Sequence, residues 1–147
     1  MPKAPSDRTL TLRRVLAGLF AAFLCAACVE ISPFDQTAYE HATALKAEAL
    51  ETMDLADENY AGHIGEVRHV RLELDENYEY AKGRPHNELS TMQWAILRDP
   101  KGHSLGGFLS RWRDQKKLNP YFVAQSEKII ADGFDMVIGL ESGKIKR

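Results

Sequence analysis

Thiols are almost absent from this chain of 147 residues, which has two cysteines, Cys25 and Cys28, and none after them. A disulfide, a cysteine-ligated metal or a cysteine nucleophile is therefore excluded from residues 29–147. Positive charge is also scarce, because from Cys28 onward fifteen Lys and Arg face twenty Asp and Glu, a formal charge of −5. Binding to phosphates needs clustered Lys and Arg, so we expect no nucleic-acid partner.

Proline and glycine are scarce in the first half of the chain. Residues 34–82 contain no proline and only two glycines, Gly62 and Gly65. On an ideal helix, one sector about 100° wide collects the apolar side chains of this segment in a single register. The stripe consists of Ala38, Ala42, Leu45, Ala49, Met53, Ala56, Tyr60, Ile64, Val67, Arg71, Leu74, Tyr78 and Ala81. The pattern predicts one long helix, bent at the glycines and about 70 Å long.

A hydrophobic run long enough to cross a membrane is absent as well. The longest uncharged stretch, residues 15–29, has about 15 residues, and a membrane-crossing helix needs roughly 20. Basic residues precede it and small residues end it, which is typical of a secretory signal peptide. The basic residues are Lys3, Arg8, Arg13 and Arg14.

The end of this signal, Leu24-Cys25-Ala26-Ala27-Cys28, resembles the lipobox of bacterial lipoproteins. The resemblance implies cleavage after residue 27 and acylation (palmitate among the acyl chains) of Cys28, which anchors the protein to a membrane. Val29, rather than aspartate, after the cysteine implies sorting to the outer membrane of a diderm cell, facing the periplasm. Two alternatives stay open: an ordinary signal cut near Ala27, and an uncleaved short anchor.

The anchor divides the chain into a signal peptide (1–27), a short membrane-proximal tether (28–33) and a helical domain (34–147). Ser32-Pro33 reads as the N-cap and first residue of the long helix. Further helices are predicted over 91–98, with a capping box at Ser90 and Gln93, over 105–117, and over 120–143 after Asn119-Pro120. No alternating strand pattern is present. We therefore predict an all-α bundle built on one long N-terminal helix with three shorter helices along it.

The last helix is predicted to form one seam with the second half of the long helix. In this seam the stripe from Tyr60 to Tyr78 packs on five apolar residues of the last helix, because neither face is stable in water. These five are Ile129, Ile130, Met136, Val137 and Leu140. The alanine-rich first half is expected to be held more loosely, or to meet a partner.

Residues 102–107, Gly-His-Ser-Leu-Gly-Gly, resemble the nucleophile elbow of α/β-hydrolases, with Ser104 in the nucleophile's position. That fold needs a preceding strand and a histidine after the serine. The predicted element before the loop is a helix, and the histidines at positions 41, 63, 69, 86 and 103 all precede Ser104. We therefore expect Ser104 to be catalytically inert.

Two polar features of the predicted long helix could have a function: a pair of possible metal ligands and an arginine within the apolar stripe. Glu66 and His69 have the Glu-x-x-His spacing of di-iron bundles, but such sites need a second pair, and both residues lie away from the apolar stripe. We therefore expect both side chains to lie on a solvent-exposed face of the helix, and we expect the protein to bind no metal and no cofactor. Arg71 lies inside the stripe, where it either extends to the bundle edge or pairs with a buried acid such as Asp132 or Glu141.

Aromatic residues gather in the second half of the chain, where they either form the core or line a pocket for an apolar ligand. They are Trp94, Phe108, Trp112, Tyr121 and Phe122. The leading functional hypothesis is a non-enzymatic envelope lipoprotein, lipid-anchored at Cys28, that acts as a structural or protein-interaction subunit. A lipoprotein that binds a small apolar ligand is the alternative, and an esterase using Ser104 comes third.

Overall fold

The computed structural model describes residues 33–143 and 145. This part of the chain is entirely helical, as expected. The α-helices are α2 (Gln36–Asp54), α3 (Ile64–Gly83), α4 (Glu88–Arg98), α5 (Leu105–Gln115) and α6 (Pro120–Glu141), and two 3₁₀ turns, η1 (Leu55–Asp57) and η2 (Tyr60–Gly62), lie between α2 and α3.

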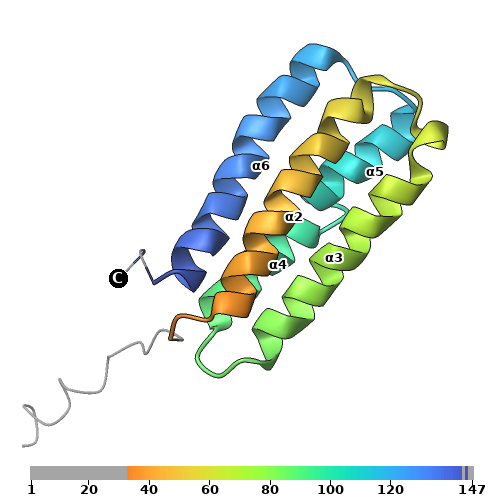
Figure 1. Cartoon of the computed structure of the whole chain (residues 1–147). Coiled ribbons are helices and arrows are strands. Elements are labelled where there is room, and N and C mark those ends of the chain that lie inside the picture. Colours follow the sequence, from red (N-terminus) through yellow and green to blue (C-terminus); the bar gives the residue numbers. More distant parts are fainter. Residues whose placement is uncertain (1–32, 144, 146–147) are drawn as a thin grey trace, which may run out of the picture. The chain divides into compact units, whose positions relative to one another are not determined.

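The prediction of one long helix is wrong. The chain leaves the helix after Asp54 and becomes extended at Glu58 (φ −100°, ψ 173°). The Asn59 side chain then accepts a hydrogen bond from the Ala61 N–H and starts η2. Side-chain capping of this kind competes with a continuing helix, so α2 and α3 form an antiparallel pair (Figure 1). Neither Gly62 nor Gly65 has another atom close to where a Cβ would lie, so neither marks a close helix contact.

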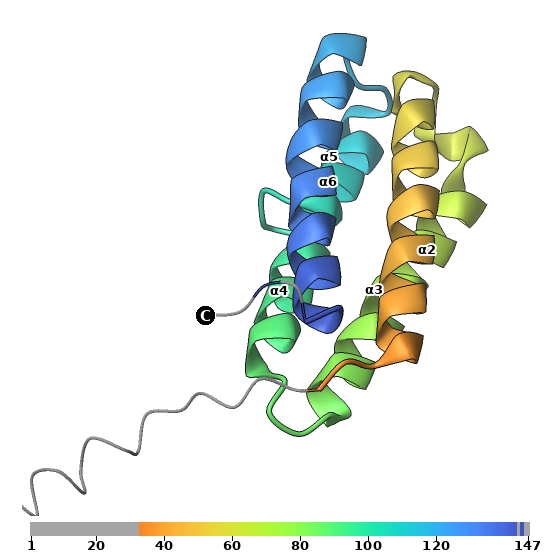
Figure 2. The same ribbon diagram turned by 60° about the vertical axis from the view of Figure 1, so that its left-hand side comes forward.

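Four helices of the bundle form a ring. In this ring α2 lies beside both α3 and α6, and α4 also packs against both α3 and α6 (Figures 1 and 2). The short helices α4 and α5 follow one another along the side beside α6 (Figure 2). The beginning of α2 and the ends of α3 and α6 meet at one end of the bundle (Figure 1).

The other end is closed by two backbone hydrogen bonds between distant segments. The Tyr60 N–H donates to the Lys116 carbonyl over 2.8 Å, and the Leu118 N–H donates to the Ala56 carbonyl over 2.8 Å. The Trp112 indole N–H also donates to the Glu58 carbonyl over 3.1 Å. These bonds hold the η1–η2 connection against the segment that joins α5 to α6.

The core corrects the predicted seam. The alanine-rich helix α2, rather than α3, packs against α6, and Ala42, Ala49 and Ala56 are fully buried. Small side chains let neighbouring helices approach closely, so this half of the stripe is central rather than loosely held. On α6, Ile130, Val137 and Leu140 are buried as expected, whereas Ile129 and Met136 are 65% and 45% exposed. Ile64 on α3 is exposed too.

Helix boundaries agree with the sequence where a strong cap is present. Asn119 accepts a hydrogen bond from the Tyr121 N–H at the start of α6, as predicted. Helix α2 instead begins one turn later than expected, because Asp35 rather than Ser32 is its N-cap and accepts a hydrogen bond from the Ala38 N–H over 2.8 Å.

The prediction of a capping box at Ser90 is also wrong, since α4 starts at Glu88 and Ser90 is buried within it. Lys116, with φ 68°, ends α5 two residues early.

Candidate functional site

The glycine-rich turn between α4 and α5 is shaped by backbone packing. A Cβ on Gly106 would clash with the carbonyl oxygen of Arg98, and one on Gly107 would clash with the carbonyl oxygen of Gly102. Only glycine fits at these two positions. The glycines of the elbow-like sequence therefore allow the first turn of α5 to lie directly on the turn that follows α4.

Ser104 is the N-cap residue of α5, with an extended backbone (φ −111°, ψ −158°) and no side-chain cap hydrogen bond. The element before its loop is α4, a helix, so the resemblance to the hydrolase elbow does not extend to its structure. Among the residues that the structure describes, neither a histidine nor a carboxylate hydrogen-bonds to Ser104 Oγ. Its catalytic inertness stays a prediction.

Ser104 nevertheless lies in the wall of a groove between α5 and α6, with a volume of about 560 Å³. The turn after α4 forms one wall, and the start of α6 forms the other. Apolar and cationic side chains share the lining with one carboxylate. The lining includes Lys101, Ser104, Phe108, Arg111, Asp114, Phe122 and Ile129. This groove is the candidate functional site, because it combines exposed apolar surface with side chains that bind anions.

Aromatic stacking forms the floor of the groove. The rings of Phe108 and Phe122 are stacked with their centroids 6.1 Å apart, and the Arg111 guanidinium lies 4.5 Å from the centroid of the Phe122 ring. A cation over an aromatic face is attracted by the ring quadrupole. Phe122 thus holds Arg111 at the groove and keeps its own ring half-buried beneath the cation.

The other aromatic residues do not join these two in a pocket. Trp94 and Trp112 are buried in the core, where Trp94 meets Phe134 edge-on at 6.0 Å and Trp112 meets Tyr60 at 5.5 Å. Tyr121 is 76% exposed. The core interpretation therefore holds for both tryptophans, and Phe122, with Phe108 beside it, is the part of the predicted cluster that lines a groove.

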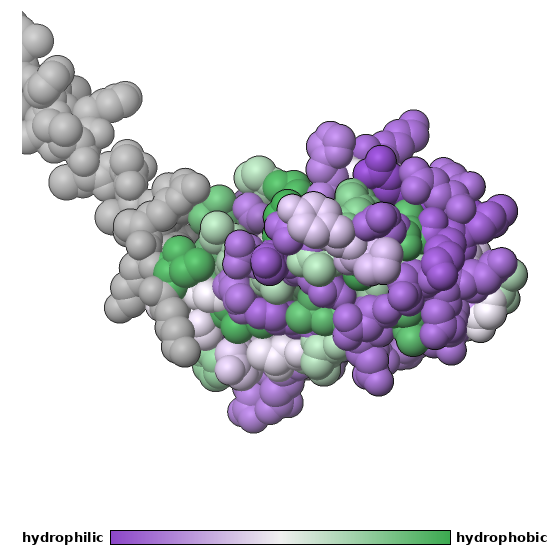
Figure 3. Space-filling model, turned by 90° about the horizontal axis from the view of Figure 1, so that it is seen from above, coloured by the Kyte–Doolittle hydropathy of each residue, from purple (hydrophilic) through white to green (hydrophobic). Residues whose placement is uncertain are grey.

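Exposed apolar side chains also occur elsewhere on α4 and α6. Met92 and Ile96 on α4 are 53% and 51% exposed, and Ile129 and Met136 on α6 are similarly open. The view from above shows hydrophobic residues as small areas between hydrophilic ones (Figure 3). Of these four residues only Ile129 lines the groove, and its exposure there supports an interaction site, whereas single exposed apolar residues elsewhere are normal.

Glu66 and His69 do not form a metal site with each other. His69 Nε2 lies 3.0 Å from the Glu48 carboxylate on α2, and both side chains are about half exposed. Glu66 is exposed in the first turn of α3. No group of three potential ligands close enough to hold a metal occurs among the described residues.

Arg71 is partly exposed and does not pair with either of the predicted acids. Its guanidinium donates to Ser110 Oγ over 3.1 Å and to the Gly106 carbonyl over 3.4 Å, both on α5. Burial lowers the pKa of this guanidinium from its usual value. Arg71 therefore links α3 to the glycine-rich start of α5 rather than to Asp132 or Glu141.

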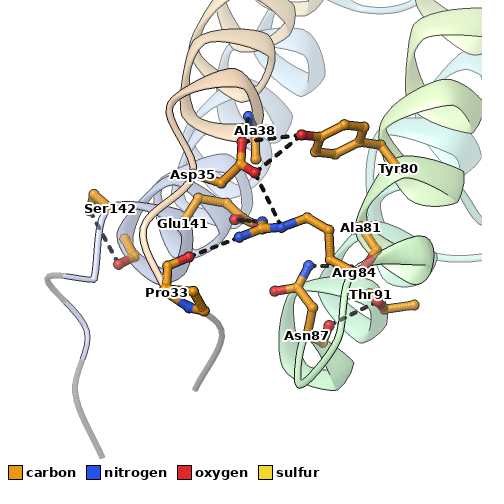
Figure 4. Close-up of polar contacts among 11 residues, drawn as sticks. Pro33, Asp35, Ala38, Tyr80, Ala81, Arg84, Asn87, Thr91, Glu141 and Ser142 are labelled. Atoms are coloured by element: carbon orange, nitrogen blue, oxygen red, sulfur yellow. Dashed lines mark hydrogen bonds and ion pairs between the residues drawn. The ribbon is translucent and has the colours of Figure 1, made fainter. Parts of the chain in front are cut away.

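A network of charged residues joins three helices at the end of the bundle where α2 begins (Figure 4). Arg84, just after α3, forms an ion pair with Glu141 of α6, whose side chain is only 2% exposed. Its Nε lies 3.5 Å from the Asp35 carboxylate, and it donates to the Pro33 carbonyl over 2.9 Å. One guanidinium thus ties the entering chain to the ends of α3 and α6.

Asp35 is held from several sides in this network. Besides capping α2, it accepts hydrogen bonds from the Tyr80 hydroxyl over 3.1 and 3.2 Å. The Ala38 N–H above all, then Tyr80 and the charge of Arg84, hold the pKa of Asp35 below its usual value against the opposing effect of burial. Sequence reasoning gave Arg84 no role beyond a helix end, and only the Gly-Arg-Pro sequence marked its position.

A pair of carboxylates lies where the end of α2 meets α6. Glu127 Oε1 is buried without a hydrogen-bond partner among the described residues. Burial first, and then the neighbouring Asp54 carboxylate, raise the pKa of Glu127 above its usual value of 4.5. Between the unfolded and the folded pKa of Glu127, the folded protein binds more protons than the unfolded chain, so the stability falls as the pH rises through this range. The pair therefore reduces stability at neutral pH.

We expect Glu127→Gln to stabilise the protein at neutral pH and to have no such effect near pH 4. Below the unfolded pKa the carboxyl is protonated in both states, and above the folded pKa the penalty is present in full. The gain should be at most about 1 kcal/mol, because the site is only partly buried. Thermal unfolding at both pH values measures it, with the exposed Asp132→Asn on the same helix as the control. An equal gain at both pH values would contradict the assignment.

The predicted lipidation residue, Cys28, lies outside the described residues, as does the proposed signal peptide. In the part that the structure covers, none of the helices has the length and apolar character needed to cross a membrane. Comparisons with protein-family models, curated proteins and solved structures found no match. Function must therefore be argued from the sequence and the geometry of the groove.

Proposed function

We propose that this protein is a non-enzymatic lipoprotein of the bacterial envelope, anchored through Cys28 in the outer membrane and facing the periplasm. Its helical bundle acts as a structural or protein-interaction subunit. The observation that carries the interaction role is the groove between α5 and α6, where Ile129 is 65% exposed beside the half-buried Phe122. The lipobox-like residues carry the anchoring role.

The end of the bundle that holds Pro33 suits a short tether. Only residues 29–32 separate Cys28 from Pro33, and Arg84 binds the Pro33 carbonyl. A bundle fixed so close to its anchor would sit near the membrane rather than on a long flexible linker. The groove lies at α5 and the start of α6, towards the other end of the bundle (Figure 2), where a partner can reach it.

The anchor is tested by metabolic labelling with a palmitate analogue. Cys28→Ser should abolish labelling and leave the unprocessed precursor, whereas the matched Cys25→Ser should be labelled and processed normally. The lipobox assignment is wrong if Cys28→Ser keeps its label. Fractionation of the labelled protein to the inner membrane would contradict the proposed location.

The interaction role is tested by placing a photocrosslinking amino acid at Ile129 in living cells. The matched control is Leu72, which is 53% exposed on α3. A discrete crosslinked protein at position 129 and none at 72 supports a partner at the groove. The same crosslinks at both positions would indicate nonspecific contact.

Binding of a small apolar ligand is the second candidate function, favoured by the Phe108–Phe122 stack in the groove. Native mass spectrometry of protein extracted from its own membrane would reveal such a ligand. An esterase role for Ser104 requires ester hydrolysis that disappears in Ser104→Ala.

A further inference from the structure

The charges of this protein are unevenly distributed along the chain. Residues 35–82, which contain α2 and α3, carry twelve Asp and Glu against four Lys and Arg. Residues 98–117, which contain α5 and the turn before it, carry six Lys and Arg against two Asp. The groove therefore lies beside the most cationic segment of an otherwise acidic body.

Two of these cations are available at the groove. Arg98 is engaged by Asp75 over 2.8 Å, and Arg113 pairs with Asp114 over 2.9 Å, so the one carboxylate in the groove's lining is already paired with a cation. Lys101 and Arg111 line the groove, and neither has an ion pair among the described residues. The Arg111 guanidinium lies 4.5 Å from the centroid of the Phe122 ring, and its N–H groups can bind a carboxylate in bidentate fashion.

We propose that the groove between α5 and α6 binds an acidic amphipathic peptide segment of a partner protein, with its carboxylates at Lys101 and Arg111 and its apolar side chains on Phe122 and Ile129. This inference rests on the proposed interaction function and names the partner's chemistry. Charge complementarity selects the acidic residues of such a segment. The exposed Ile129 beside the Phe108–Phe122 stack provides the apolar contact.

The lining favours a peptide over an acyl chain. The hydroxyl-bearing residues Ser104 and Ser126 line the groove together with Phe122 and Ile129. Backbone amides of a bound peptide need such hydrogen-bonding partners, whereas an acyl chain gains most from a closed apolar cavity. An anionic membrane is a further alternative, which the experiment below separates from a peptide.

The experiment selects ligands for the full chain, reconstituted in neutral phosphatidylcholine nanodiscs, from a displayed library of random dodecapeptides. Enriched peptides are expected to combine Asp or Glu with Leu, Phe or Trp. The affinity of the most enriched peptide, measured by fluorescence polarisation, should fall about tenfold or more in Arg111→Glu and in Lys101→Glu. It should also fall as NaCl rises from about 0.05 to about 0.3 M.

Lys128→Glu is the matched control. The substitution changes the net charge by the same amount, and Lys128 is exposed on α6 and does not line the groove. Circular dichroism verifies that each variant is folded, and Ile129→Ser tests the apolar contact without changing charge. The proposal is overturned if no peptide is enriched, if the enriched peptides lack acidic residues, or if Lys128→Glu weakens binding as much as Arg111→Glu. Binding to phosphatidylglycerol vesicles that competes with the peptide and exceeds its affinity would assign the groove to a membrane instead.

The peptide affinity depends on the groove rather than on the anchor: nanodiscs hold the acylated protein, and a protein that is not acylated is measured in solution. A failure of palmitate labelling at Cys28 leaves the peptide affinities unchanged, and a failure of peptide binding leaves the labelling unchanged.

Discussion

Replacing Arg84 with methionine should lower the free energy of unfolding by about 3 to 5 kcal/mol, because it leaves the Glu141 carboxylate buried and uncompensated. The Glu141 side chain is 2% exposed, and its Oε1 already lacks a hydrogen-bond partner among the described residues. Methionine retains much of the volume and the apolar stem of arginine, so the loss comes mainly from charge. Urea denaturation followed by circular dichroism measures it.

Two further variants separate the buried charge from general damage at this end of the bundle. Arg84→Met combined with Glu141→Leu should recover much of the lost stability, because the buried charge is then removed together with its partner. Arg98→Met breaks the more exposed pair with Asp75, whose side chain is 63% exposed, and should cost less than about 1 kcal/mol. Equal losses for Arg84→Met and Arg98→Met would show that burial of Glu141 is not what makes Arg84 important.

Replacing Gly107 with alanine should cost at least about 2 kcal/mol, although only one methyl group is added. The new Cβ would meet the carbonyl oxygen of Gly102, which belongs to the backbone of the turn and cannot rotate away as a side chain does. To accommodate it, the start of α5 must move away from α4. Thermal unfolding of the variant measures the cost.

Gly65→Ala is the matched control for this prediction. Gly65 is exposed in the first turn of α3, and no other atom lies within 4 Å of where its Cβ would be. Alanine there should stabilise the helix by about 0.5 to 1 kcal/mol, since it loses less backbone entropy on folding. If both alanines stabilise the protein, the packing of the α4–α5 turn is looser than the structure indicates.

The sequence predicted the helices best where local chemistry decides the outcome. Asn119-Pro120 starts α6 because the amide caps the helix and proline fits its first turn. It failed at residues 55–63, where the apolar stripe keeps its register across a reversal of the chain. Helical periodicity cannot distinguish one continuous helix from two helices whose connection keeps the apolar residues in the same register. The sequence Asp57-Glu58-Asn59, rich in residues that favour turns, was the available signal.

The candidate site was less predictable because it depends on contacts between distant segments. The glycines of residues 102–107 were interpreted through a hydrolase resemblance. In the structure they are needed because the backbone of Arg98 and of Gly102 lies where a Cβ would be. The Arg111–Phe122 contact joins two helices, and no spacing within either one encodes it. Arg84 and Glu141, 57 positions apart, likewise meet only in the folded bundle.

The pairing of α2 with α6 has a consequence for the time at which the protein folds. The first helix of the bundle packs against the last one, so its apolar face has no complete partner until residues 120–141 have been synthesised. Because domains fold as units during synthesis, a nascent chain that lacks α6 cannot complete this core. If the chain is exported through the general secretory route, which accepts unfolded polypeptides, this late closure keeps it competent for passage and defers folding to the far side of the membrane.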